Sequence, residues 1–340
     1  MIVRDQKLLA LATRLAAEAD RGRPLHLEPL GGGRNNRVFR VATDRGDPVV
    51  LKCYFRDVRD TRDRRLAEWT FLTYARAHGV TNVPKPLATA PGDGASLLGF
   101  VTGNRVKPGG LTRTQIIAAL DFVIALNPIP RELSAMPAAS ESCFAIDEHI
   151  ATVTRRIARL SALDPRAPLR AEASALVADE IVPAWQRVSA RLTRAVAADA
   201  NRHAEPIHGC DVIYSPSDFG FHNALVDDAG RVAFLDFEYA GRDDPAKLLC
   251  DFFCQPDVPV DRQYFNEFLD QWASGLRLGD TYRLRASLLL DAYRIKWACI
   301  MLNDFLSLGD ARRAFADPQQ RAERCHTQLT KARAALAVID

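Results

Sequence analysis

Hydrophobic positions in the first hundred residues recur first with a helical period and then in short runs. Leu8, Leu11 and Leu15 form an apolar stripe that predicts an amphipathic helix. The runs that follow are separated by turn sequences, which is typical of short strands. The elements expected here are a helix over 3–20, strands over 25–30, 37–41 and 48–54, and a helix over 60–78. This part of the chain therefore predicts a small antiparallel sheet with helical packing.

The remainder of the chain has mostly helical periodicity. Ile150, Val153, Ile157 and Leu160 recur at spacings of three and four, and Pro183 is expected to kink a helix that runs from about 171 to 198. Further helices are expected over 116–124, 248–253 and 285–308. Two short apolar runs at 224–226 and 232–235, joined by a turn at 227–230, instead predict a β-hairpin. The second part of the chain is thus expected to be mainly helical.

Composition and charge narrow the class of protein. Hydrophobic residues make up 48% of the 340-residue chain and charged residues 26%, as in soluble globular proteins. The net charge of +3 gives no reason to expect binding to nucleic acid or to a membrane surface. No run is long enough for a membrane span or a signal peptide, and the seven scattered cysteines favour reduced thiols. We therefore expect a cytoplasmic protein.

Polar residues flank the predicted hairpin at spacings that carry chemical meaning. Asp218 and Asn223 precede it, and Asp236 follows its second strand. Phosphoryl transfer needs a carboxylate that orients the acceptor hydroxyl and two oxygen ligands for the Mg²⁺ on the nucleotide phosphates. A loop that leads into a hairpin can deliver three such groups to one point. An Asx turn before an ordinary hairpin also accounts for these residues, so the decision depends on the upstream sequence.

The segment SPSDFGFHNALVDDAGRVAFLDFE, residues 215–238, resembles the catalytic segment of the aminoglycoside phosphotransferase and choline kinase family. That family typically reads H-G-D-x-x-x-x-N, followed by D-[FWY]-[EDG]. The resemblance implies that Asp218 is the catalytic residue and that Asn223 and Asp236 bind the metal. It covers most of residues 25–255.

The segment departs from the family pattern at three positions. Pro216 and Ser217 stand where the family has His and Gly, and Gly220 stands where a second His is common. None of these changes removes a group that the chemistry needs. An upstream sequence, His208 to Asp211, looks superficially similar, but it lacks an Asn five residues later. We interpret it as the lead-in to the loop.

The resemblance also implies where the nucleotide binds. Gly31, Gly32 and Gly33 lie between two predicted strands, where a flexible turn covers phosphates with backbone N–H groups. Ordinary hairpin turns can have the same composition. Phe100 and Val101 belong to a stretch, 97–103, that resembles the family's last strand and hinge. Backbone groups there would meet the adenine.

Lys52 is a charged residue in an otherwise apolar predicted strand, where its ammonium needs a partner. In kinases that partner is the pair of α- and β-phosphates, together with a helix glutamate. The resemblance assigns the glutamate to Glu68, sixteen residues later. The alternatives are a strand lysine whose head group reaches solvent and a glutamate on a helix surface.

Together these features predict an α+β, bilobal, protein-kinase-like fold. A small N-terminal nucleotide-binding lobe, with an antiparallel sheet plus helix, is expected over 1–103, and a larger, mainly helical acceptor-binding lobe over 104–340. The expected function is ATP- and Mg²⁺-dependent phosphorylation of a hydroxyl group on a small molecule, of the sugar or amino-sugar type. The alternatives are a kinase of an aminoglycoside or choline-like amine and a nucleotide-binding pseudokinase; a protein kinase is disfavoured. The sequence gives no indication of which proteins, if any, are partners.

Overall fold

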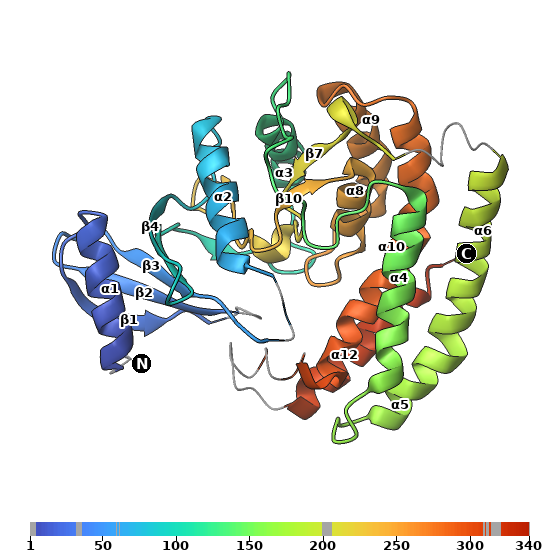
Figure 1. The fold of residues 1–340 in the computed structure, drawn as a ribbon, viewed down its shortest axis with the longest axis horizontal. Helices are drawn as coiled ribbons and strands as arrows, with labels where there is room; N and C mark the ends of the chain where they lie inside the picture. The colour runs from blue at the N-terminus through green and yellow to red at the C-terminus, as the bar shows by residue number, and fades with distance from the viewer. Residues whose placement is uncertain are drawn as a thin grey trace. The chain divides into compact units, whose positions relative to one another are not determined.

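The computed structural model describes residues 5–31, 36–58, 60, 62–198, 206–308, 310, 313 and 321–339. They form two compact units (Figure 1). Unit 1 contains the residues up to Arg105 together with the segment Asn223–Tyr239. Unit 2 contains Val106–His222, Ala240–Asp310 and the C-terminal helix α12. The predicted boundary after residue 103 assigns the chain to lobes by sequence order alone, whereas Asn223–Tyr239 groups with unit 1 by its contacts.

Unit 1 is built on an antiparallel sheet of five strands in the order β1-β2-β3-β5-β4. Side chains alternate between its two faces, so Phe39, Val41, Val49 and Leu51 all point to one buried layer. The sheet strands are β1 (Pro24–Pro29), β2 (Arg37–Thr43), β3 (Val49–Cys53), β4 (Pro86–Ala90) and β5 (Ala95–Gly99). The small antiparallel sheet predicted from the sequence is therefore present.

Two helices accompany this sheet. Helix α1 (Gln6–Glu18) buries Leu8 and Leu15 in the same apolar cluster as the strands, which accounts for its predicted stripe. Helix α2 (Arg64–Ala77) begins where the Asp63 side chain accepts a hydrogen bond from the N–H of Leu66. It starts four residues later than predicted.

A second, three-stranded sheet completes unit 1. Strand β6 (Asn104–Arg105) pairs with β8 (Ala224–Val226), which pairs with β9 (Val232–Phe234). The carboxylate of Asp227 accepts hydrogen bonds from the N–H groups of Ala229 and Arg231 and so closes the turn between β8 and β9. The predicted hairpin is confirmed.

Unit 2 is mainly helical, as expected. The long helix α10 lies at its centre and contacts α4, α6, α8, α9 and α12 (Figure 1). A short ladder of β7 (Ile213–Ser215) and β10 (Gly241–Asp243) is its sheet component. The helices are α3 (Arg113–Leu126), α4 (Ile146–Arg159), α5 (Arg170–Ala175), α6 (Val182–Ala198), α8 (Pro245–Cys254), α9 (Phe265–Gly275), α10 (Thr281–Met301) and α12 (Arg321–Leu336).

The helix predicted over 171–198 is interrupted in a different way from the expected kink at Pro183. Residues Leu176–Ile181 form a π-helical turn between α5 and α6. Proline has no backbone N–H and its ring crowds the preceding turn. The extra residue per turn just before Pro183 relieves this conflict, so the irregularity lies on the N-terminal side of the proline.

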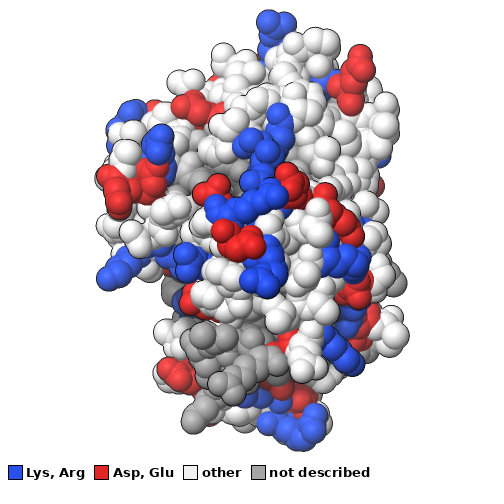
Figure 2. Space-filling model, turned by 90° about the vertical axis from the view of Figure 1, so that its left-hand side faces the viewer, with Lys and Arg blue, Asp and Glu red and all other residues white. Residues whose placement is uncertain are grey.

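Two surface properties bear on possible partners. Acidic and basic side chains are interspersed on the face shown in Figure 2, in keeping with the small net charge. Within the residues that the structure describes, no helix is both long enough and apolar enough to span a membrane.

Candidate active site

The centre of the site in unit 1 is the ammonium group of Lys52. It extends from β3, is 5% exposed, and lies 2.5 Å from Oε2 of Glu68 and 2.6 Å from Oδ1 of Asp236. Burial alone would lower the pKa of Lys52, but the carboxylates of Asp236 and Glu68 raise it well above its ordinary value. The expected contact between Lys52 and Glu68 is present, and Lys52 does not extend to solvent.

Glu68 connects helix α2 to two other parts of unit 1. Its Oε2 accepts a hydrogen bond of 2.7 Å from the hydroxyl of Tyr54, and its Oε1 accepts one of 3.3 Å from the N–H of Phe237. The Phe237 ring stacks on Phe71 of α2 with 4.1 Å between ring centroids. Glu68 is buried, so it is not a surface helix residue. Helix α2 therefore holds both the lysine and the turn that follows Asp236.

Asp236 follows β9 in a left-handed backbone conformation, with φ of +66°. Its side chain is 29% exposed, more than either of its partners Lys52 and Glu68. Burial raises the pKa of Asp236 to about 6; Lys52 opposes this shift, and the nearby Glu238 and Glu68 reinforce it. A cation at the exposed side of this carboxylate would stabilise its ionised form.

Asn223 lies beside Asp236 because of the hairpin register. Ala224 pairs with Phe234, and the N–H of Leu235 donates a hydrogen bond of 2.8 Å to the carbonyl of Asn223. Asn223 and Asp236 therefore stand at the same end of the hairpin, where an amide and a carboxylate oxygen fit a hard divalent cation. Within the described residues, no cluster of three or more His, Cys, Asp or Glu side chains could hold a metal. Two protein ligands suit a metal that is completed by nucleotide phosphates.

Glu238 is a buried residue that the sequence reasoning did not single out. Its Oε2 accepts a hydrogen bond of 2.9 Å from Asn36, and its Oε1 lies 3.0 Å from Nη1 of Arg64. Arg64 is also paired with Asp60, at 2.5 Å. Asn36 lies three residues after Gly33 in the chain and immediately before β2, so Glu238 connects the residue that precedes β2 to the start of α2. Its place in the Asp-Phe-Glu sequence was the available signal.

The structure describes three of the other five residues that were predicted to bind the nucleotide. Gly31 lies in the turn after β1, where an added Cβ would meet no atom within 4 Å. Gly32 and Gly33 lie outside the described residues. Phe100 and Val101 follow β5 and are half-buried. The guanidinium of Arg40 lies 5.5 Å from the centre of the Phe100 ring.

Asp218 belongs to unit 2, in the loop after β7. Ser217, at the position where the resembled family has glycine, has a φ of +65°, a conformation that glycine adopts more easily. The neighbouring Phe219 ring stacks on Phe122 and Phe252, and Phe221 is 1% exposed. The Asp218 side chain, directly before the first of these phenylalanines, is 32% exposed and lies 3.2 Å from Nε2 of His222. The loop is thus fixed by aromatic packing and still presents its carboxylate.

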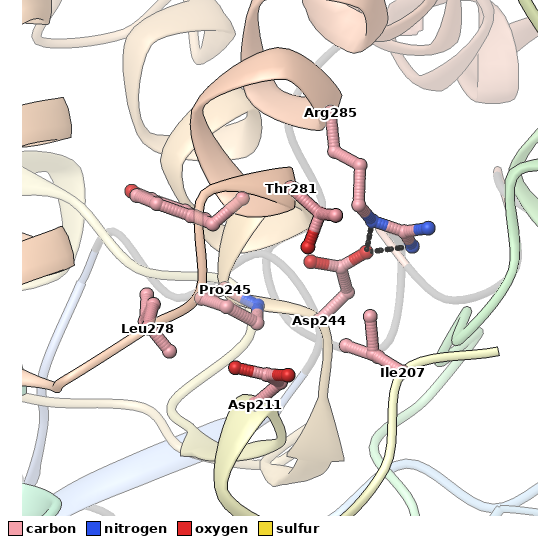
Figure 3. A pocket seen from close by; sticks show the side chains of 8 residues that line it. Ile207, Asp211, Asp244, Pro245, Leu278, Thr281 and Arg285 are labelled. Atoms are coloured by element: carbon pink, nitrogen blue, oxygen red, sulfur yellow. Dashed lines mark hydrogen bonds and ion pairs between the residues drawn. The ribbon is translucent and has the colours of Figure 1, made fainter. Parts of the chain in front are cut away.

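The similar sequence upstream has a structural role. Gly209–Asp211 forms a short 3₁₀ turn that leads into β7, as interpreted from the sequence. Asp211 lines a small cavity in unit 2 with Ile207, Asp244, Pro245, Leu278, Thr281, Tyr282 and Arg285 (Figure 3). This cavity is too small for anything larger than a water molecule.

Asp244 caps the N-terminus of helix α8. Its Oδ1 accepts a hydrogen bond of 2.7 Å from the N–H of Ala246 at the start of α8, and its Oδ2 is paired with Arg285 (Figure 3). Nε2 of His149 donates a hydrogen bond of 3.1 Å to the same oxygen, and its Nδ1 lies 2.7 Å from the Tyr293 hydroxyl oxygen. Burial would lower the pKa of His149, but its hydrogen bond to Asp244 raises it to about 9. This network ties α4, α8 and α10 together.

A second lysine cluster lies in the interior of unit 2. Nζ of Lys296 lies 2.8 and 2.9 Å from the two carboxylate oxygens of Asp251, and Nζ of Lys247 lies 2.6 Å from Asp243 and 3.5 Å from Asp251. Lys296 is 4% exposed, so it forms a buried ion pair and does not face solvent.

Comparison with known proteins agrees with this arrangement. A model of the phosphotransferase enzyme family matches residues 26–286, more than three quarters of the chain. The chain belongs to this family. Membership makes it a small-molecule kinase and confirms the resemblance seen in the sequence. No curated protein sequence matches this phosphotransferase significantly.

Solved structures share the fold of this phosphotransferase at low sequence identity. A choline kinase from Streptococcus pneumoniae is similar over 98% of this chain and 99% of its own, with a TM-score of 0.60 and 15% identity. An amicoumacin kinase in complex with AMP-PNP and Ca²⁺ covers 98% and 94%, with a TM-score of 0.58 and 14% identity. A macrolide 2′-phosphotransferase from Brachybacterium faecium covers 92% and 99%, with a TM-score of 0.52 and 19% identity. The predicted protein-kinase-like fold is confirmed.

Proposed function

We propose that this phosphotransferase transfers the γ-phosphoryl group of ATP to a hydroxyl group of a small molecule. The contact of Lys52 with both Glu68 and Asp236 carries the proposal. An ammonium between a helix glutamate and a partly exposed carboxylate is the arrangement that positions nucleotide phosphates and their metal in kinases. The amicoumacin kinase of the same fold binds an ATP analogue and a divalent cation, which supports the same ligands here.

Each predicted residue has a role in this proposal. Lys52 neutralises phosphate charge and Glu68 holds it in place, while the segment Gly31 to Gly33 covers the phosphates. Backbone groups at Phe100 and Val101 meet the adenine. Asn223 and Asp236 would hold Mg²⁺, which supplies neutralisation of the phosphate charge when it is bound. The donor set at the end of the hairpin fits that ion.

Asp218 is the proposed catalytic base. Its carboxylate orients the acceptor hydroxyl and takes the proton as the hydroxyl oxygen attacks the γ-phosphorus. The bond from the γ-phosphorus to the β,γ-bridging oxygen breaks, and ADP leaves with that oxygen. Loss of such a base typically lowers kcat by about 10²–10⁴-fold.

We further propose a hydroxylated metabolite of the sugar or amino-sugar type as the acceptor. Three acidic residues of unit 2, Asp243, Asp244 and Asp251, are each already paired with Lys or Arg. They are therefore not available to bind a polycationic antibiotic. Because a choline kinase and a macrolide phosphotransferase share this fold, amines and macrolides are the alternative acceptors.

The test is ADP release from ATP and Mg²⁺ with a panel of sugars, amino sugars, aminoglycosides, macrolides and choline-type amines. Acceptor-dependent release with a sugar or amino sugar, lost in Asp218→Asn, is the expected result. Release with another class only would overturn the proposed acceptor but not the kinase activity. ATP binding without release on any acceptor would favour the pseudokinase alternative.

A further inference from the structure

His222 is placed against the catalytic loop in a way that the family pattern does not predict. Its Nε2 lies 3.2 Å from Oδ1 of Asp218, four residues earlier, and its side chain is 13% exposed. Because a carboxylate only accepts hydrogen bonds, the imidazole Nε2–H is the donor. The two positions where histidines are common in the resembled family hold Pro216 and Gly220. The imidazole that contacts the carboxylate therefore comes from a different place in the loop.

Gly220 makes room for this imidazole. A Cβ added at Gly220 would lie 2.9 Å from Nδ1 and 3.1 Å from Cε1 of His222, closer than carbon atoms approach such groups. The φ of Gly220 does not lie in the left-handed region, so backbone freedom does not explain the glycine. Phe221, which stands between these two residues in the chain, is 1% exposed and begins the 3₁₀ turn Phe221–Asn223. The imidazole of His222 thus occupies space that a side chain at position 220 would need.

We propose that His222 is a positioning residue that orients the Asp218 carboxylate for phosphoryl transfer, and that Gly220 provides the space it needs. This inference rests on the proposed role of Asp218. A hydrogen bond to Oδ1 restricts rotation of the carboxylate and so presents Oδ2 in a fixed direction. The acceptor proton moves to Asp218, and His222 neither gains nor loses a proton. Misplacing a reacting group by about 1 Å can lower a rate about 100-fold.

The first experiment compares His222→Gln with His222→Leu. The amide of Gln can place a donor near the position of Nε2, whereas Leu fills similar space without a donor. We expect kcat of His222→Leu to fall about 10- to 100-fold, with little change in KM for ATP or in the melting temperature. His222→Gln should recover most of kcat. A purely structural histidine would instead change the melting temperature and leave kcat of the folded fraction intact.

The second experiment uses Gly220→Ala in two backgrounds. In the wild-type chain the new Cβ should displace the imidazole and lower kcat toward that of His222→Ala. In the His222→Ala background the same substitution should have little further effect, because the obstructed ring is gone. Gly279→Ala is the matched control, since a Cβ there would meet no atom closer than 3.8 Å. It should leave kcat unchanged.

The outcomes separate this inference from the proposed function. If Asp218→Asn retains activity, the role of Asp218 is wrong and the positioning role is wrong with it. If Asp218→Asn is inactive but His222→Leu has normal kcat, only the positioning role is overturned. An equal effect of Gly220→Ala in both backgrounds would also overturn it, because the contact with Gln255, 3.3 Å from the added Cβ, would then be the cause.

Discussion

Each unit of the molecule contains a buried lysine held by carboxylates, and the two clusters differ in their balance of charge. In unit 1 one ammonium, Lys52, faces two carboxylates, Glu68 and Asp236. In unit 2 two ammonium groups, Lys247 and Lys296, face the two carboxylates of Asp243 and Asp251. The first cluster has an unneutralised negative charge and the second has none.

The clusters also differ in exposure. The Asp236 side chain is 29% exposed, whereas that of Asp251 is 7% exposed and that of Asp243 is fully buried. A surplus carboxylate that reaches solvent can meet a cation from outside, and a balanced, sealed pair cannot. If the first cluster binds the nucleotide and its metal as proposed, the protein leaves the charge of its ligand-binding cluster unbalanced and balances the charge of its structural cluster.

The largest expected effect is the loss of activity in Asp236→Asn. Removing the charge that would hold the metal should lower kcat about 10³-fold or more, equivalent to roughly 4 kcal/mol. Stability at pH 7 should not fall. The raised pKa of Asp236 means that the folded state binds the proton more tightly than the unfolded state, so ionisation destabilises the fold as pH rises through about 6. Steady-state kinetics and thermal unfolding at pH 7 test both parts.

Two results would contradict this assignment. Near-normal turnover in Asp236→Asn would remove Asp236 from the metal site. A large loss of stability would mean that the first cluster is structural like the second.

The next largest effect is a loss of stability, expected when the second cluster in unit 2 loses a carboxylate. Asp251→Ala leaves Lys296 buried without its carboxylate, and removing one partner of a buried pair typically costs about 3–5 kcal/mol. We expect about 3 kcal/mol, since Lys247 keeps Asp243 and Lys296 keeps its position 4.6 Å from the Tyr293 ring centre. Urea unfolding measures the loss, and Asp251→Asn should lose less.

A surface pair provides the control. Asp270, 66% exposed and 2.9 Å from Arg283, should change stability by less than about 0.5 kcal/mol when replaced by Asn. Asp251→Ala with unchanged stability and reduced turnover would place this second cluster in the active site instead.

The sequence predicted the parts of this comparison that depend on local pattern or on spacing along the chain. Alternation of apolar residues indicated the strands, and the position of Glu68 relative to Lys52 indicated their contact. It did not indicate that Lys296 pairs with Asp251, or that Glu238 pairs with Arg64. These partners are 45 and 174 residues apart, and buried polar pairs at such distances are set by tertiary packing, which leaves no periodic signal.

The same limit applies within the loop that contains Asp218. The spacing of Asp218, Asn223 and Asp236 is visible in the sequence, and their roles stay a prediction. The contact of His222 with Asp218 depends on how the loop turns between two buried phenylalanines, which no residue spacing describes. The π-helical turn before Pro183 is similar, because a proline indicates an irregularity but not the side on which the helix absorbs it.

A smaller effect is expected from pH acting on unit 2. The pKa of His149 is raised to about 9, so the folded state holds a proton that the unfolded state releases near its ordinary value of about 6.5. The stabilisation is complete below about pH 6.5 and is lost as pH rises to about 9, by up to roughly 3 kcal/mol. Thermal unfolding of wild type between pH 6 and 9.5 should show this decline. In His149→Gln the decline should be much weaker, and an equal decline would assign it to another group.

The smallest effect is expected from Glu238, which pairs with Arg64 in unit 1. Arg64 lies between the carboxylates of Asp60 and Glu238, so this pairing, unlike that of Lys52, is part of the framework that holds Asn36. Glu238→Gln keeps the shape and one acceptor oxygen but removes a charge, and Arg64 retains Asp60. We expect a loss of about 1 kcal/mol in the free energy of unfolding. KM for ATP should rise while kcat at saturating ATP changes little, because Asn36 lies three residues after Gly33.

Glu28→Gln is the matched control, since Glu28 is 40% exposed and 3.3 Å from Arg40 in the same unit. It should leave both the free energy of unfolding and KM for ATP essentially unchanged. A fall in kcat of Glu238→Gln comparable to that of Asp236→Asn would place Glu238 among the groups that contact the nucleotide or its metal. The first cluster would then contain three carboxylates, those of Glu68, Asp236 and Glu238, with Lys52 and Arg64 as their cationic partners.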